Sequence, residues 1–125
     1  MSDQETTALL TRFMAAWNAH DVDVLVACMT PDGGAFYASS GPGRVGTAAV
    51  GTAAVRKAYA AIFETFPDAQ WTNGRHFVAG EDACSYWTFV GTRKDGTKVE
   101  VNGCDLFKIR DGKIAVKDSY RKQIV

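Results

Sequence analysis

Two aspartates, Asp105 and Asp118, interrupt apolar runs near the end of the sequence, where β-strands usually place hydrophobic side chains. If Asp111-Gly112 is a two-residue hairpin turn, the flanking strands carry Asp105 directly opposite Asp118. Because side chains alternate along a strand, this register puts both carboxylates on the core-facing side. A carboxyl pair at the end of an apolar pocket is suited to acid/base catalysis, with Asp105 as the central group.

Two adjacent buried carboxylates repel each other, so a neighbouring feature must relieve the charge. The pair could share a proton, Arg75 on the next strand could lie between them, or a bulge near Gly103 could separate them. Each carboxylate could instead bind amides, hydroxyls or an arginine and do no chemistry. The same register places Lys117 and Arg121 on the opposite face of the sheet, and their closeness to Asp118 favours a structural role for that residue.

The preceding hairpin, with Asp95-Gly96 as its turn, sets Tyr86 opposite Asp105 on the inner face. Tyr120 follows Asp118 on that face because the side-chain period is two. The opposite face then carries three large apolar side chains: Trp87, Phe89 and Leu106. Such an exposed patch indicates a partner, and we expect a homodimer through this sheet face.

The rest of the chain contributes a set of aromatic side chains: Phe13, Trp17, Tyr37, Tyr59 and Phe63. They either pack in the core or, with Arg75, Tyr86 and Tyr120, line a pocket for a small hydrophobic molecule. His76 is a candidate base only if it faces inward. The three cysteines have neither metal-type spacing nor a visible activating base, so we expect no metal site and no thiolate nucleophile. Phosphate-binding motifs are absent, and we expect no cofactor.

These residues must be positioned by helices in the first half of the chain and strands in the second. Apolar residues at three- and four-residue spacing predict helices over 4–20, 22–29 and 53–65, with Asp21 as an N-cap. The tandem GTAAVGTAAV (46–55) is interpreted as a loop leading into the third helix. Strands are predicted around Phe36 and, from β-rich runs, over 70–79, 84–92, 98–110 and 113–121. This order predicts an α+β fold in which helices cover one face of a curved antiparallel sheet.

The overall composition narrows the class of protein. We expect a single domain, 1–125, with 46% hydrophobic residues and a formal net charge of zero. No basic surplus favours nucleic acid or an acidic membrane as a partner. The N-terminus has neither the basic nor the long apolar region of a signal peptide, and no apolar run has membrane-spanning length. We therefore expect a cytoplasmic location.

Three segments carry a family resemblance: LLTRFMAAWNAHDVDVLVACM, AAVRKAYAAIFETFPD and GCDLFKIRDGKIAVKDSYRK. Together they resemble the SnoaL-like branch of the nuclear transport factor 2-like superfamily, which includes ketosteroid isomerases, polyketide cyclases and limonene epoxide hydrolases. The resemblance implies a cone: a strongly curved antiparallel sheet wrapped around helices, with a pocket inside and commonly a homodimer through the sheet. Fold transfers more safely than function in this superfamily.

Residue by residue, the resemblance singles out Asp105. It falls where ketosteroid isomerases keep a protonated aspartic acid, whereas Phe13 and Tyr37 fall where those enzymes have their oxyanion tyrosine and general base. The resemblance therefore does not imply steroid isomerisation. The epoxide hydrolase triad falls at Tyr86, Thr88 and Ser119 and is not reproduced, although a rearranged set of Asp105, Asp118 and Arg75 is conceivable.

Polyketide cyclases of this fold use an acid/base aspartate in a hydrophobic pocket, which Asp105 would supply. The sequence thus predicts a pocket protein for a small hydrophobic molecule that, if it is an enzyme, performs isomerisation, aldol-type cyclisation or hydration. The alternative is a non-catalytic binding or dimerisation module whose aspartates are structural.

Overall fold

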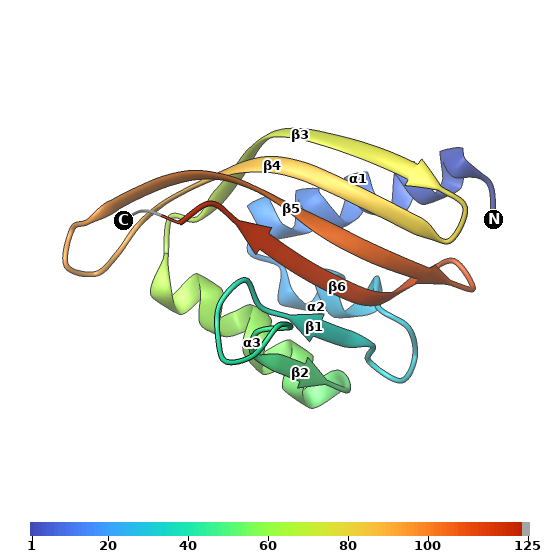
Figure 1. Ribbon diagram of the computed structural model, residues 1–125, viewed down its shortest axis with the longest axis horizontal. Helices are drawn as coiled ribbons and strands as arrows, with labels where there is room; N and C mark the ends of the chain where they lie inside the picture. The colour runs from blue at the N-terminus through green and yellow to red at the C-terminus, as the bar shows by residue number, and fades with distance from the viewer. Residues whose placement is uncertain (124–125) are drawn as a thin grey trace.

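The computed structural model describes residues 1–123 (Figure 1). The helices are α1 Asp3–Asn18, α2 Val22–Ala27 and α3 Thr52–Thr65. The strands are β1 Ala35–Tyr37, β2 Ala48–Val50, β3 Gln70–Ala79, β4 Asp82–Thr92, β5 Lys98–Arg110 and β6 Lys113–Arg121. All the predicted helices and strands are present, so the α+β prediction is confirmed.

Helix α1 begins at a capping box, in which Ser2 accepts from the amide of Glu5 and the Glu5 carboxylate accepts from the amide of Ser2. Its buried stripe repeats every three to four residues and faces the sheet: Thr6, Leu9, Leu10, Phe13, Ala16 and Trp17. His20, with φ of 56°, ends the helix in the left-handed region. The predicted cap on α2 is also confirmed, because the Asp21 carboxylate accepts from the amide of Val24 at 3.1 Å.

The tandem pentapeptide adopts two structures. Its first copy contains strand β2, which the sequence did not predict, and its second copy opens helix α3. Gly51, with φ of 90°, separates them in a conformation that favours glycine. Val50 is 69% exposed on the edge strand, whereas the equivalent Val55 is fully buried.

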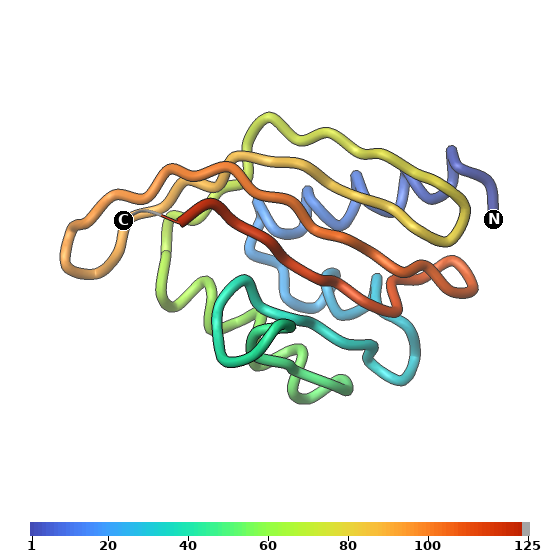
Figure 2. The backbone as a smooth tube through the Cα atoms, in the orientation of Figure 1, coloured from blue at the N-terminus to red at the C-terminus, as the bar shows by residue number. Residues whose placement is uncertain are grey.

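The six strands form one sheet in the order β2-β1-β6-β5-β4-β3. All neighbours are antiparallel except β1 and β6, which pair in parallel, so the expectation of a purely antiparallel sheet was wrong at this one pair. The sheet curves strongly over the helices, and the β4–β5 hairpin continues beyond the end of α3 (Figures 1 and 2). The concave face therefore encloses the core, where aromatic rings from α1, α3 and the sheet meet edge to face.

Candidate functional site

Asp105 lies on the concave face of β5, with Ser85 of β4 and Ser119 of β6 as its cross-strand neighbours. The residue is 6% exposed. Its Oδ2 accepts from Nε1 of Trp87 at 2.9 Å, and its Oδ1 accepts from Oγ of Ser119 at 2.6 Å. Lys117 Nζ lies 3.2 Å from the same Oδ1. Three donors therefore converge on this one carboxyl group, and both of its oxygens act as acceptors.

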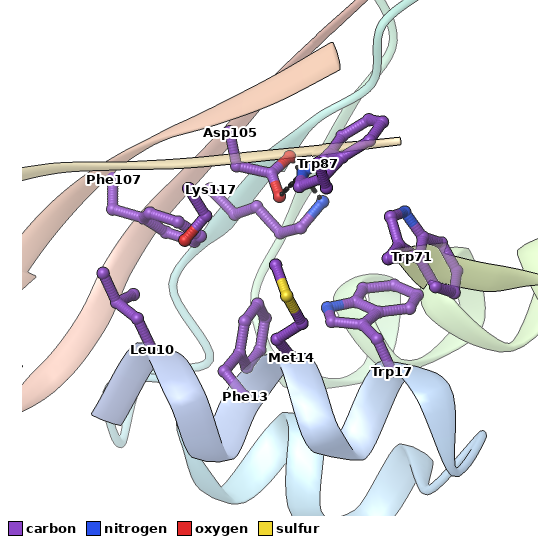
Figure 3. A pocket seen from close by; sticks show the side chains of 10 residues that line it. Leu10, Phe13, Met14, Trp17, Trp71, Trp87, Asp105, Phe107 and Lys117 are labelled. Carbon is purple, nitrogen blue, oxygen red and sulfur yellow. Dashed lines mark hydrogen bonds and ion pairs between the residues drawn. The ribbon is translucent and has the colours of Figure 1, made fainter. Parts of the chain in front are cut away.

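Lys117 is the functional residue that the sequence reasoning missed. It is 5% exposed and pairs with Asp105 (Figure 3). Its Nζ also donates to Ser119 Oγ at 2.7 Å. The ammonium also lies over three aromatic rings, at 5.0 Å from the centroid of Trp17, 4.6 Å from Phe36 and 5.9 Å from Tyr59. Burial lowers the pKa of Lys117, and the charge of Asp105 opposes that effect.

The predicted Asp105–Asp118 pairing was wrong because of one extra residue in β6. The Asp111-Gly112 turn is present, both residues having positive φ, and Ile109 pairs with Ile114 as predicted. The next pair is Lys108 with Val116, so a bulge shifts the register by one residue. A one-residue shift exchanges the two faces of a strand.

The bulge therefore turns Lys117 inward and Asp118 outward. Asp118 pairs with Leu106 on the convex face and accepts from the hydroxyl of Tyr120 at 3.2 Å. The two aspartates are thus separated by the sheet itself. A bulge had been considered near Gly103; it lies instead beside Lys108.

The preceding hairpin was also out of register by one residue. Arg93 donates its amide to the carbonyl of Thr97, which leaves three residues in the loop instead of the two that were predicted. Tyr86 consequently pairs with Cys104 and points outward, where it is 38% exposed. Trp87 and Phe89, predicted for the outer patch, are buried inside at 4% and 1% exposure. Of that patch, only Leu106 is exposed.

The remaining predicted pocket residues divide between the two faces of the sheet. Phe13, Trp17 and Tyr59 lie in the core, and Phe63 packs beside them, 5.4 Å from Trp17 between ring centroids. Four others lie on the convex side, away from the core: Tyr37, which pairs with Asp118, Arg75, which lies over the ring of Phe77, Tyr86 and Tyr120.

His76 faces inward, which was the condition set for its candidacy as a base. Its Nδ1 lies 2.7 Å from Oγ of Ser85, the cross-strand neighbour of Asp105. Burial lowers the pKa of His76, which favours the neutral imidazole. Among residues 1–123, no group of three or more His, Cys, Asp or Glu side chains is arranged to hold a metal ion.

A cavity of about 350 Å³ lies between α3, the concave face of the sheet and the loop after β1. It is lined by Trp17, Phe36, Ala38, Ser39, Ser40, Ala58, Ala61, Ile62, Thr65, Phe66, Trp71, Trp87, Phe89, Lys117, Ser119 and Arg121. Most of this wall is apolar, and its size is in the range of small-molecule sites.

Asp105 lies behind the wall of this cavity. A separate void of about 10 Å³, large enough for about one water, lies beside it (Figure 3). Lys117 and the three tryptophans of the chain line both spaces. Three residues of the large cavity, Lys117, Ser119 and Trp87, contact Asp105, which does not line that cavity itself. The buried Nε1 of Trp17 has no hydrogen-bond partner among the described residues.

Residues 10–117 match the sequence-family model of the SnoaL-like domain. No curated protein matches the sequence. In the part of the chain that the structure describes, no helix is long and apolar enough to cross a membrane.

Several solved structures share the fold. A proposed polyketide cyclase from Xanthomonas campestris pv. campestris superimposes with a TM-score of 0.83 at 20% identity, covering 94% of this chain and 90% of that one. A proposed SnoaL-like polyketide cyclase from Jannaschia sp. CCS1 gives a TM-score of 0.83 at 21% identity, with 98% and 90% covered. A protein with a ketosteroid isomerase-like fold from Catenulispora acidiphila DSM 44928, in complex with trimethylamine, gives 0.78 at 18% identity, with 90% and 83% covered.

Proposed function

The chain belongs to the SnoaL-like family, and from that premise we propose that it binds a small hydrophobic carbonyl compound and catalyses its enolisation without a cofactor. Enolisation is the step common to isomerisation and aldol-type cyclisation. The observation that carries the proposal is the hydrogen-bonded chain from Lys117 through Ser119 to Asp105, which begins at the wall of an apolar cavity. The likeness to two proposed polyketide cyclases is consistent with this class of reaction.

In the proposed reaction, each polar group has a distinct role. The N–H groups of Lys117 and Trp17 donate to the substrate carbonyl oxygen, and they stabilise the negative charge that develops there. Ser119 takes the α-proton while passing its own proton to Oδ1 of Asp105, 2.6 Å away. Trp87 is a positioning residue, since its indole N–H holds Oδ2 of Asp105.

The alternative is a binding protein without catalysis, and one observation favours it. Asp105 already has three donors within the chain and lies behind Lys117, an arrangement that would also serve only to hold the buried lysine. In that case the cavity would bind a ligand and leave it unchanged.

Proton exchange distinguishes the two functions. A panel of apolar ketones headed by 2-tetralone would be incubated with the protein in D₂O, and loss of the α-proton signals would be followed by NMR. Asp105→Asn should slow exchange on the order of 100-fold or more, a usual contribution of acid/base catalysis. The matched control is Asp118→Asn on the convex face, which should exchange at the wild-type rate.

Two results would contradict catalysis. One is a folded Asp105→Asn protein that exchanges as fast as wild type. The other is wild-type protein that binds the ketones, as measured by fluorescence of the cavity tryptophans, without accelerating exchange over the protein-free rate. The second result would support the binding function.

We also propose a homodimer through the convex face of the sheet, with contact residues of which Leu106 alone was predicted. Four large side chains are between 38% and 51% exposed there: Phe77, Tyr86, Leu106 and Tyr120. Leu106→Lys should yield monomers in sedimentation velocity, whereas Val45→Lys, which alters an exposed apolar residue in a loop, should leave the dimer intact. A wild-type protein that is monomeric at micromolar concentration would refute the dimer.

A further inference from the structure

The charge of the cavity wall identifies a class of ligand within the proposed function. Two of its lining residues are cations, Lys117 and Arg121, and none is acidic, although the chain as a whole has a formal net charge of zero. Asp105 lies behind the wall and neutralises Lys117. Arg121 has no such counter-ion, because no carboxylate among residues 1–123 lies within 4 Å of its guanidinium. The cavity is therefore positive at its Arg121 end.

Arg121 is held at this wall by the fold. Residues 117, 119 and 121 alternate with outward-facing residues of β6, so Lys117, Ser119 and Arg121 form one inward row. The guanidinium of Arg121 lies 5.2 Å from the ring centroid of Phe89, and that ring also lines the cavity. This cation–π contact holds the guanidinium at the cavity wall, and none of residues 1–123 forms a hydrogen bond with its N–H groups.

A second arginine increases the positive charge near the cavity. Arg93, from the β4–β5 loop, lies 5.1 Å from the ring centroid of Phe66, another lining residue. Burial lowers the pKa of Arg121, and repulsion from Arg93 lowers it further. Two like charges in proximity are stabilised by an anion between or beside them. Asp95 neighbours Arg93 at the loop but does not line the cavity.

We infer that the ligand of this cavity is an apolar carboxylic acid whose carboxylate binds Arg121, with its reactive carbonyl near Lys117. This inference rests on the proposed function only for the placement of the carbonyl. The two cations are four positions apart on the extended strand, which gives roughly 13 Å between their Cα atoms at ~3.3 Å per residue. The ligand is therefore an elongated body of about two fused or linked rings, with the acid at one end.

A charged and a neutral probe of equal shape test the inference. 4-Biphenylcarboxylate and 4-biphenylcarboxamide would be titrated into the protein by isothermal titration calorimetry at low salt. Both probes can accept from the guanidinium, but only the carboxylate adds a charge–charge attraction and a bidentate fit, so it should bind about tenfold tighter or more. The preference should decrease as salt is added.

Arg121→Gln should bring the ratio of the two dissociation constants close to one. Arg12→Gln, on the exposed side of α1, is the matched control and should keep the ratio. If the Gln variant fails to fold, Arg121→Lys replaces it and should reduce the ratio without abolishing it, since the charge stays but the planar fork is lost.

Equal binding of the two probes by wild type, or a preference that survives in Arg121→Gln, would overturn the inference. These titrations need no turnover, so they separate the two proposals. A carboxylate preference without α-proton exchange would leave the ligand class standing and refute the catalytic function.

Discussion

Replacing Lys117 by Met tests whether the Asp105–Lys117 pair organises the concave face. Met keeps roughly the length of the side chain and removes its charge, so the Asp105 carboxyl group stays buried without its cation. Breaking a buried ion pair in this way costs about 3–5 kcal/mol. The free energy of unfolding of a small domain is only about 5–15 kcal/mol, so the substitution should remove a large part of it. The urea midpoint should fall by about 2 M at a typical dependence on denaturant.

The exposed pair of Lys108 and Asp82 on the same sheet provides the matched control. Its side chains are 61% and 65% exposed, so Lys108→Met should cost far less stability than Lys117→Met. The double variant Lys117→Met with Asp105→Leu removes both buried charges and should recover part of the loss. It leaves Trp87 Nε1 and Ser119 Oγ without their acceptor, at about 1–3 kcal/mol for a buried unsatisfied donor.

Urea unfolding of the wild type, Lys117→Met, Asp105→Leu and the double variant, followed by circular dichroism and tryptophan fluorescence, gives the free energies for a double-mutant cycle. We expect the double variant to be more stable than Lys117→Met alone. The role of the buried pair would be refuted if Lys117→Met cost no more than Lys108→Met, or if the losses from the two buried substitutions simply added.

Two further predictions concern the neighbours of this pair. In Gly103→Ala the new Cβ would lie 2.5 Å from the Tyr120 carbonyl oxygen and 2.6 Å from the Trp87 ring. We therefore expect the free energy of unfolding in urea to fall by about 1–3 kcal/mol and the tryptophan fluorescence spectrum to change. The control is Asn102→Ala, and a Gly103→Ala midpoint equal to that of the wild type and of the control would contradict the expectation. Burial and the nearby Cys104 raise the pKa of Cys84 from 9.0 to about 11, so at pH 9 only about 1% should be thiolate, against half in the unfolded chain. Because the fold holds this proton more tightly, the Cys84 contribution to stability is full below pH 9 and is lost as the pH rises through 11. Iodoacetamide labelling with peptide mass spectrometry at pH 9 should therefore be slow in native protein and fast in urea, and equal rates would exclude the raised pKa.

Local patterns in the sequence were sufficient to predict the helices and every strand except β2. The stripe of α1, the Asp21 cap and the β-rich runs depend on neighbours within a few residues, and they led to an α+β fold that the structure confirms. The same patterns also singled out Asp105 as a buried acid, and it is buried. The aromatic residues Phe13, Trp17 and Tyr59 do lie in the core.

Long-range pairing decided which residues share a face, and sequence patterns did not reveal it. One bulged residue in β6 and one extra residue in the β4–β5 loop reversed the facing of Lys117, Asp118, Tyr86 and Trp87. Because the side-chain period of a strand is two, an error of one residue moves every later side chain to the other face. A lysine beside an aspartate in a strand gives no local sign of which one is buried.

The tandem pentapeptide also shows that local sequence alone does not decide the structure of a segment. Two identical GTAAV segments become an edge strand and the first turn of a helix, with Val50 exposed and Val55 buried. Because the two segments are identical, long-range contacts decide which secondary structure each one adopts. The first copy pairs with β1, and the second packs Val55 into the core. Composition and periodicity determined the elements and the apolar interior. The burial of Lys117 against Asp105, and the positive end of the cavity at Arg121, arose only when the strands paired in their actual register.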